Sequence, residues 1–121
     1  MDRPALATRE IARELRFKNV WTKELDKVFS DVAPYYDTAN YIASLGLWGF
    51  FRAQFIATVD LRSGERVLDV CAGTNAIGIA LLERDRSLEV YAIDRSAAMQ
   101  EVGGRSAQAK GLRIRSVIGS V

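Results

Sequence analysis

The chain has 121 residues, and 49% of them are hydrophobic, which is enough for one small domain with a buried core. Its 17 basic and 15 acidic residues leave a formal net charge of +2, so charge gives no support for nucleic-acid binding. The chain has no histidine and one cysteine, Cys71, which disfavours a metal site, histidine-based catalysis and an internal disulfide.

The N-terminal region mixes charged residues, among them Asp2, Glu10 and Glu14, with its apolar ones, which argues against a signal or transit peptide. No run of about 18 apolar residues occurs anywhere, so no membrane span is expected. We therefore expect a cytoplasmic protein.

The first half of the sequence has the apolar spacing of amphipathic helices. The spacing predicts helices over residues 4–18, 22–33, 38–46 and 48–59. Thr22 is the expected N-cap of the second helix. Residues 1–61 are thus predicted to form a helical cap or extension.

The second half alternates short β-branched runs with helical stretches. Strands are expected over 66–70, 88–93 and 112–118, and helices over 76–83 and 96–109. This alternation predicts right-handed crossovers and a parallel sheet. The fold class is therefore α/β, with residues 62–121 as the β-α-β-α-β half of a Rossmann-like doubly wound sheet, strand order 3-2-1, in one compact unit with the extension.

A glycine-containing turn follows the first predicted strand. Ala72, Gly73 and Ala76 are small enough for a ligand to approach the backbone, and Asn75 tolerates left-handed backbone angles. Asp94 ends the second strand 21 residues after Gly73, the spacing of a carboxylate that binds ribose hydroxyls. Together these features predict a nucleoside site.

Two nucleoside cofactors fit this pattern. The spacing of Gly73, Asn75 and Gly78 imitates a dinucleotide fingerprint, so a fragment of a dinucleotide-binding oxidoreductase is the weaker alternative. Asp69, at the end of the first strand, would repel a pyrophosphate but attract the ammonium and sulfonium of S-adenosylmethionine (SAM). SAM or S-adenosylhomocysteine is therefore the expected cofactor.

Two stretches of the sequence resemble the ubiquinone/menaquinone-biosynthesis C-methyltransferases, which are class I SAM-dependent methyltransferases. The first is VLDVCAGT at 67–74 together with Ile-Asp at 93–94, and many methyltransferases share it. The second is VFSDVAPYYDTAN at 28–40 with SLG at 44–46, which is more specific to this family. Asn75 departs from the family pattern, in which a glycine is usual.

The resemblance implies roles for residues of the site. Asp69, Gly73 and Thr74 would line the methionine end of the cofactor, and Asp94 would hold its ribose. The others lie around these, with Arg95 and Met99 at the adenosine, Tyr36 in a helical cap beside Asp37, and Arg52 at the methionine carboxylate. The complete expected cofactor-binding set is Tyr36, Arg52, Asp69, Cys71, Gly73, Thr74, Asn75, Asp94, Arg95 and Met99.

The resemblance also implies a function and its partners. Family chains are considerably longer, and the acceptor-binding wall belongs to the half not found here. We expect the SAM-binding portion of a methyltransferase that acts on a small acceptor such as a quinone precursor, or alternatively a non-catalytic, dimeric SAM-binding module. The first strand has an open edge, which a second copy, the missing C-terminal half or the N-terminal helices would cover.

Overall fold

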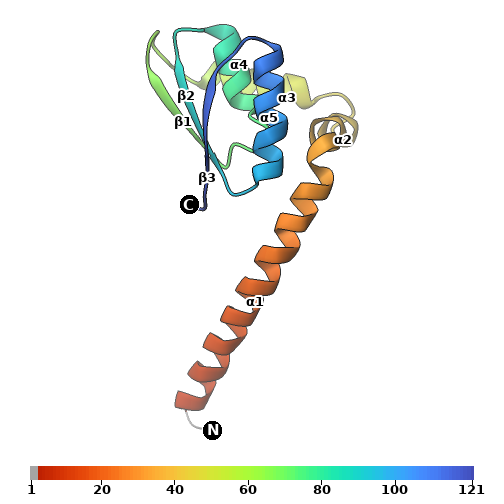
Figure 1. Ribbon diagram of the computed structural model, residues 1–121, viewed down its shortest axis with the longest axis vertical. Helices are drawn as coiled ribbons and strands as arrows, with labels where there is room; N and C mark the ends of the chain where they lie inside the picture. Colours follow the sequence, from red (N-terminus) through yellow and green to blue (C-terminus); the bar gives the residue numbers. More distant parts are fainter. Residues whose placement is uncertain (1–2) are drawn as a thin grey trace.

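The computed structural model describes the backbone of residues 3–121 and the side chains of 8–18, 20 and 22–121. The elements follow one another as α1 (Arg3–Val32), a 3-10 turn η1 (Ala33–Tyr35), α2 (Tyr36–Ala43), α3 (Trp48–Thr58), β1 (Arg66–Val70), α4 (Ala76–Arg84), β2 (Glu89–Asp94), α5 (Ala97–Ala109) and β3 (Ile114–Ile118). Figure 1 shows a three-stranded sheet with helices packed against it and one long helix that runs away from it.

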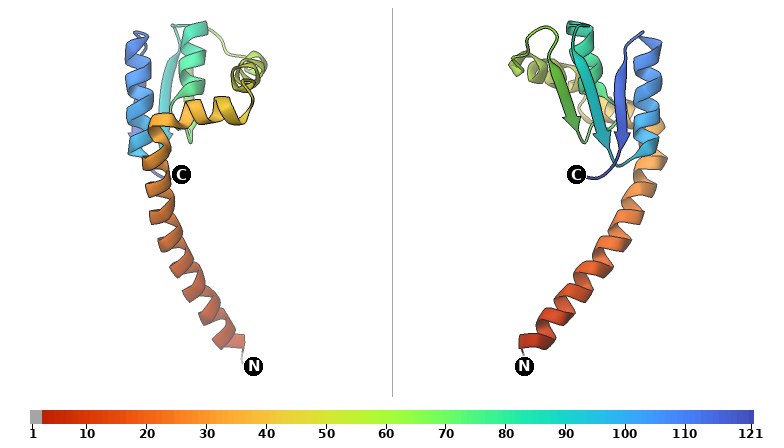
Figure 2. Two further views of the ribbon diagram at one scale, coloured as in Figure 1. Left: turned by 90° about the vertical axis from the view of Figure 1, so that its right-hand side faces the viewer. Right: turned by 60° about the vertical axis from the view of Figure 1, so that its left-hand side comes forward.

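The three strands are parallel and lie in the order β1-β2-β3, which confirms the predicted fold class and strand order. Both views of Figure 2 place α4 and α5 on the same face of the sheet. On that face Val67, Val90 and Ile114 are aligned in register and pack into the core. A Cβ on Gly78 of α4 would meet Val90 at 3.0 Å, so the third residue of the apparent fingerprint serves close helix–sheet packing.

The N-terminal helices differ from the prediction at one point. Residues 4–18 and 22–33 were expected as two helices, but α1 is continuous over 30 residues. Thr22 is no N-cap; its hydroxyl donates a hydrogen bond to the carbonyl of Lys18 one turn back, at 2.6 Å. The sequence between Pro4 and Pro34 contains no glycine or proline, so nothing breaks the helix there.

The shorter helices α2 and α3 agree with the prediction to within a few residues. The segment after α2 turns back through Leu45 and Gly46, whose φ angles of 55° and 81° are left-handed. At its other end α3 is tied to the sheet domain, because Arg84 of α4 donates a hydrogen bond to the carbonyl of Ile56 at 3.0 Å. Ile56 is buried in the same core as the residues of α4 and β2.

The N-terminal part of α1 extends away from the rest of the molecule (Figures 1 and 2). Apolar side chains on this part are exposed, including Ile11 at 58% and Phe17 at 63%. Within residues 3–121, none of the helices combines the length and the apolar character that crossing a membrane requires.

Within the described part of the chain, no helix covers the other face of the sheet or the outer edge of β1 (Figures 1 and 2). Leu68 of β1 is 63% exposed, and Val70 and Val117 on the same face are also exposed. The helices therefore cover one face of the sheet, whereas in a complete doubly wound fold helices cover both faces. The division of the chain into a cap of residues 1–61 and a half-domain of 62–121 stays a prediction, since α1 and α2 both contact the half-domain directly.

Candidate functional site

The loop between β1 and α4 lies at the carboxyl end of the sheet, where ligands bind in open α/β folds. Three of its residues, Cys71, Gly73 and Asn75, have left-handed φ angles of 58°, 58° and 61°. Glycine adopts this conformation freely and asparagine with little cost, whereas a cysteine there is strained. The backbone is thus held in a sharply folded form directly below the ends of the strands.

Asp94, the last residue of β2, ties this loop to the start of α5. One carboxylate oxygen accepts a hydrogen bond from the amide of Gly73 and the other from the amide of Ser96, both at 2.8 Å. Ser96 in turn caps α5, since its hydroxyl oxygen accepts from the amide of Met99 at 3.2 Å. Each oxygen of Asp94 keeps a second lone pair with which it can accept from a ligand hydroxyl.

A cavity of about 450 Å³ opens beside Asp94. Its size is in the range of small-molecule sites. Its wall comes from the carboxyl ends of β1, β2 and β3 with the residues that follow them, the start of α5, the start of α2 and two residues of α1. The lining residues that the sequence predicted are Tyr36, Cys71, Gly73, Asp94, Arg95 and Met99.

Thr74 and Asn75 lie behind this wall and not on it. Both are buried, with 3% and 1% of their surfaces exposed. The hydroxyl of Thr74 donates a hydrogen bond to the carboxylate of Asp37 at 2.8 Å, which fastens the cap helix α2 to the loop. These two residues thus support the cavity from outside it.

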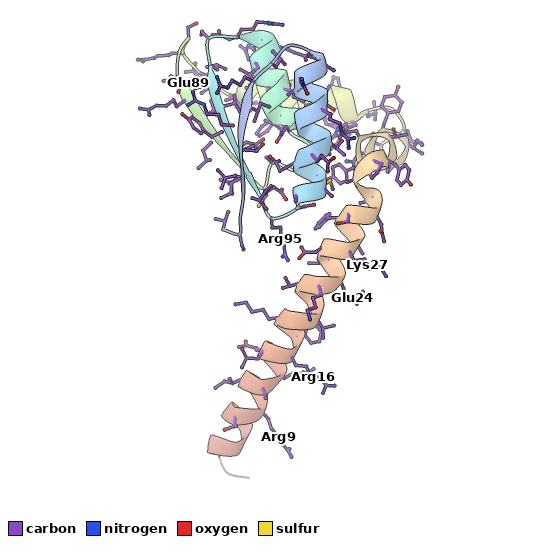
Figure 3. The ribbon with its side chains drawn as sticks, in the orientation of Figure 1. Arg9, Arg16, Glu24, Lys27, Glu89 and Arg95 are labelled. Carbon is purple, nitrogen blue, oxygen red and sulfur yellow. The ribbon has the colours of Figure 1, made fainter. Side chains whose placement is uncertain are left out.

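Arg95 lines the cavity, but its guanidinium group turns toward α1. It forms an ion pair with Asp26 at 3.0 Å and donates to the carbonyl of Thr22 at 3.4 Å. Figure 3 shows Arg95 at the lower end of the sheet domain, next to α1. In this arrangement Arg95 holds the long helix against the cavity.

Like Thr74 and Asn75, the predicted residues Asp69 and Arg52 do not line the cavity. Asp69 lies half-buried in β1, on the helix-covered side of the sheet. Burial, with a smaller contribution from the negative charge of Asp94, raises the pKa of its carboxyl above the ordinary value of 3.8. Arg52 lies on α3, which packs against α4. Their roles toward a cofactor stay predictions.

Several residues of the site were not predicted as part of it. Leu25 and Phe29 of α1 line the cavity, although the sequence predicted only that they belong to a helix. Gln100 and Ser116 form a hydrogen-bonded support under the loop. Gln100 directly follows the predicted site residue Met99 in the sequence. No local signal, however, indicates which buried polar groups its side chain contacts.

A parallel β-α-β-α-β unit whose glycine loop is tied to a strand-end aspartate, beside a cavity, defines a nucleoside-binding protein of the Rossmann-like class. Comparison with known families takes this one step further. The model of the ubiE/COQ5 methyltransferase family matches residues 17–120, so the chain belongs to that family. The resemblance found in the sequence is thereby confirmed.

Individual relatives agree with this assignment. The chain is 39% identical over 72 residues to the ubiquinone/menaquinone biosynthesis C-methyltransferase UbiE of Xanthomonas campestris pv. campestris, a match that covers 56% of this chain and 28% of that protein. It is 32% identical over 88 residues to the demethylmenaquinone methyltransferase of Thermus thermophilus, covering 73% and 40%. The chain thus spans less than half the length of these curated relatives.

Solved structures share the architecture. The YcgJ protein of Bacillus subtilis superposes with a TM-score of 0.50 at 30% identity, over 57% of this chain and 29% of its own. A SAM-dependent methyltransferase of Thiobacillus denitrificans, solved in complex with S-adenosyl-L-homocysteine, superposes with a TM-score of 0.51 at 26% identity, over 56% and 28%.

Proposed function

We propose that this chain binds SAM in the cavity beside Asp94 and forms the cofactor-binding part of a methyltransferase. The observation that carries the proposal is the Gly73–Asp94 hydrogen bond, which presents a strand-end carboxylate and a bare stretch of backbone to one cavity. Family membership supports the choice of SAM among nucleoside cofactors.

The residues around the cavity suit the parts of SAM. The free lone pairs of Asp94 would accept hydrogen bonds from the ribose hydroxyls. Met99, Phe29 and Leu25 offer apolar surface for the adenine ring. Asp69, when ionised, places a negative charge near the cationic end of the cofactor, and Gly73 leaves room there because nothing lies within 4 Å of its missing side chain.

The proposed reaction needs little from the chain beyond placement. When bound, SAM would supply an electrophilic methyl group for transfer to an electron-rich atom of the acceptor, with the carbon–sulfur electron pair staying on sulfur. Tyr36 and Cys71 line the cavity and, with the α2 cap, would restrict water there. Holding acceptor and cofactor in line supplies much of the rate.

The acceptor is a separate proposal. Relatives of this chain are named demethylmenaquinone methyltransferase, which supports a quinone precursor as the class of acceptor. Incubating the protein with SAM labelled in its methyl group and with a demethylated quinone should transfer the label. Tight SAM binding without any transfer would favour the alternative of a non-catalytic SAM-binding module. Action in the cytoplasm stays a prediction.

Titration calorimetry with SAM, S-adenosylhomocysteine and NAD tests the cofactor. We expect both sulfur compounds to bind in a one-to-one ratio and NAD to give no heat of binding, since Asp69 would oppose a pyrophosphate. Binding of NAD with no response to SAM would instead support an oxidoreductase fragment.

SAM affinity should fall on acidification through the raised pKa of Asp69, because the protonated carboxyl no longer attracts the cationic cofactor. Asp69→Asn should bind SAM more weakly at pH 7 and lack this dependence. Calorimetry across the acidic range checks both expectations. A variant whose affinity follows the same pH curve as the wild type would show that another group titrates.

Asp69→Asn should increase the stability of the protein, although it weakens SAM binding. With its raised pKa, folded Asp69 binds more protons than unfolded Asp69 between the ordinary value of 3.8 and the raised one. The stability that wild type owes to this group therefore declines as pH rises through that window. Cofactor-free Asp69→Asn should consequently gain stability over wild type near neutral pH in urea unfolding.

We further propose that a second copy of the chain covers the outer edge of β1. The edge offers unpaired backbone groups beside Leu68 and Val70, which are 63% and 45% exposed. Antiparallel pairing of two β1 strands about a twofold axis would join both sheets. Light scattering should then report a dimer, and a monomer at all concentrations would contradict this proposal.

A further inference from the structure

Two residues of α5, one turn apart, form a support for the glycine loop, which we call the α5 seat: Gln100 and Gly103. The side-chain amide of Gln100 donates hydrogen bonds to the carbonyl of Gly73 and to the side-chain oxygen of Asn75, each at 2.8 Å. Gly103 lies directly under the loop backbone at Thr74. Neither Gln100 nor Gly103 was among the predicted site residues.

Gln100 is itself held in place. It is 4% exposed, and its side-chain oxygen accepts a hydrogen bond from the hydroxyl of Ser116 on β3 at 2.7 Å. The carbonyl of Gly73 can only accept, so it requires the donor end of the Gln100 amide to face the loop, and the bond from Ser116 holds the oxygen end on the side of β3. A buried amide with all these partners is a rigid element.

The loop needs such a support because Asn75 is not a glycine. Asn75 holds a left-handed conformation, with φ 61° and ψ 23°, and its side chain is almost fully buried. A buried amide is costly without partners, and one end of the Asn75 side chain, its Nδ2, has none among the described residues. Gln100 supplies the partner for the other end.

Gly73 connects this support to the cofactor site. Gly73 is gripped through both its polar backbone atoms, because its N–H donates to Asp94 and its carbonyl accepts from Gln100. A change at Gln100 therefore reaches the carboxylate of Asp94 through a single residue.

We propose that Gln100, oriented by Ser116, is a positioning residue for the cofactor: it sets the glycine loop so that Gly73 and Asp94 meet the nucleoside. The inference rests on the proposed function, which supplies the nucleoside. Gln100 contacts the loop and not the cavity, so its effect passes through Gly73 and Asn75.

Gln100→Leu tests this directly, with Gln108→Leu as the matched control. Gln108 lies on the same helix, but its side chain is exposed. We expect Gln100→Leu to weaken SAM binding about 10-fold or more in calorimetry, since it leaves buried groups unpaired. The control should bind like wild type. Equal affinities of the two variants would overturn the proposal.

A rescue experiment separates positioning from general destabilisation. In Gln100→Leu the buried side chain of Asn75 has lost its partner, so adding Asn75→Gly removes an unpaired amide and restores a residue that adopts left-handed angles freely. The double variant should recover about threefold or more of the lost affinity. A double variant that binds no better than Gln100→Leu would overturn the role of Asn75.

Amide hydrogen exchange keeps the proposal testable without cofactor. In Gln100→Leu the amide of Gly73 should exchange faster, whereas those of Val90 and Ala92 in the core of β2 should be unchanged. If Gln100→Leu does not fold, Ser116→Ala on the exposed strand β3 is the second variant. It retains the Gln100 side chain but removes the hydrogen bond that orients it, so the amide of Gly73 should again exchange faster, by a smaller factor. Unchanged Gly73 exchange in a folded variant would refute positioning. Absence of SAM binding by the wild-type protein would refute the proposed function but not the role of Gln100 in positioning the loop.

Discussion

Gly103→Ala should abolish measurable SAM binding and destabilise the protein by about 1–3 kcal/mol, the usual cost of overpacking a tight interior. The added Cβ would lie 2.6 Å from the carbonyl oxygen of Thr74 and 2.7 Å from the side-chain nitrogen of Asn75. The nearer atom belongs to the backbone, so the loop itself must move. Urea unfolding measures the loss of stability, and calorimetry with SAM measures the loss of binding.

Gly104→Ala is the matched control, because the same change is made one residue along the same helix. Nothing lies within 4 Å of the Cβ that it would add. An exposed glycine in a helix interior costs up to about 1 kcal/mol relative to alanine, so this variant should be as stable as wild type or more so. Equal stability and affinity of the two variants would mean that the loop does not rest on Gly103.

Asp94→Ala should weaken SAM binding about 100-fold, because two charge-assisted hydrogen bonds to the ribose are lost together. The amides of Gly73 and Ser96 also lose their acceptor, which should destabilise the loop by about 1–3 kcal/mol. Calorimetry and urea unfolding report the two losses separately.

Asp85→Ala separates the loss of binding from the loss of structure. Asp85, directly after α4, likewise accepts hydrogen bonds through both carboxylate oxygens, from the amide of Ser87 at 2.9 Å and from the hydroxyl of Ser63 at 2.8 Å, but it lies outside the cavity. We expect this variant to lose some stability and to keep its SAM affinity. If Asp94→Ala bound SAM as tightly as Asp85→Ala, the ribose would be held by another group.

The two halves of the chain could be predicted from the sequence to different extents. The strands and helices after residue 62 were predicted closely, because a short apolar run followed by a glycine turn is a local signal. The break predicted before Thr22 was wrong for an equally local reason. A threonine suits an N-cap, but it also fits inside a helix when its hydroxyl bonds the preceding turn, as it does to Lys18.

The amino-acid sequence by itself determined the β-α-β-α-β order, the glycine turn after the first strand with an asparagine at 75 that tolerates left-handed angles, and the placement of Asp94 at the end of a strand. Each of these depends on residues close together in the chain. The family resemblance, too, lies in short contiguous stretches.

The tertiary structure alone decided how these parts make a site. The bonds from Gln100 to Gly73 and Asn75 join residues 27 and 25 positions apart, and the bond from Arg95 to Asp26 spans 69. Such contacts depend on which face each helix presents after packing, and no local spacing encodes that. For the same reason Gly103 has no signal in the sequence as a seat residue: its missing side chain matters only where the loop descends onto α5.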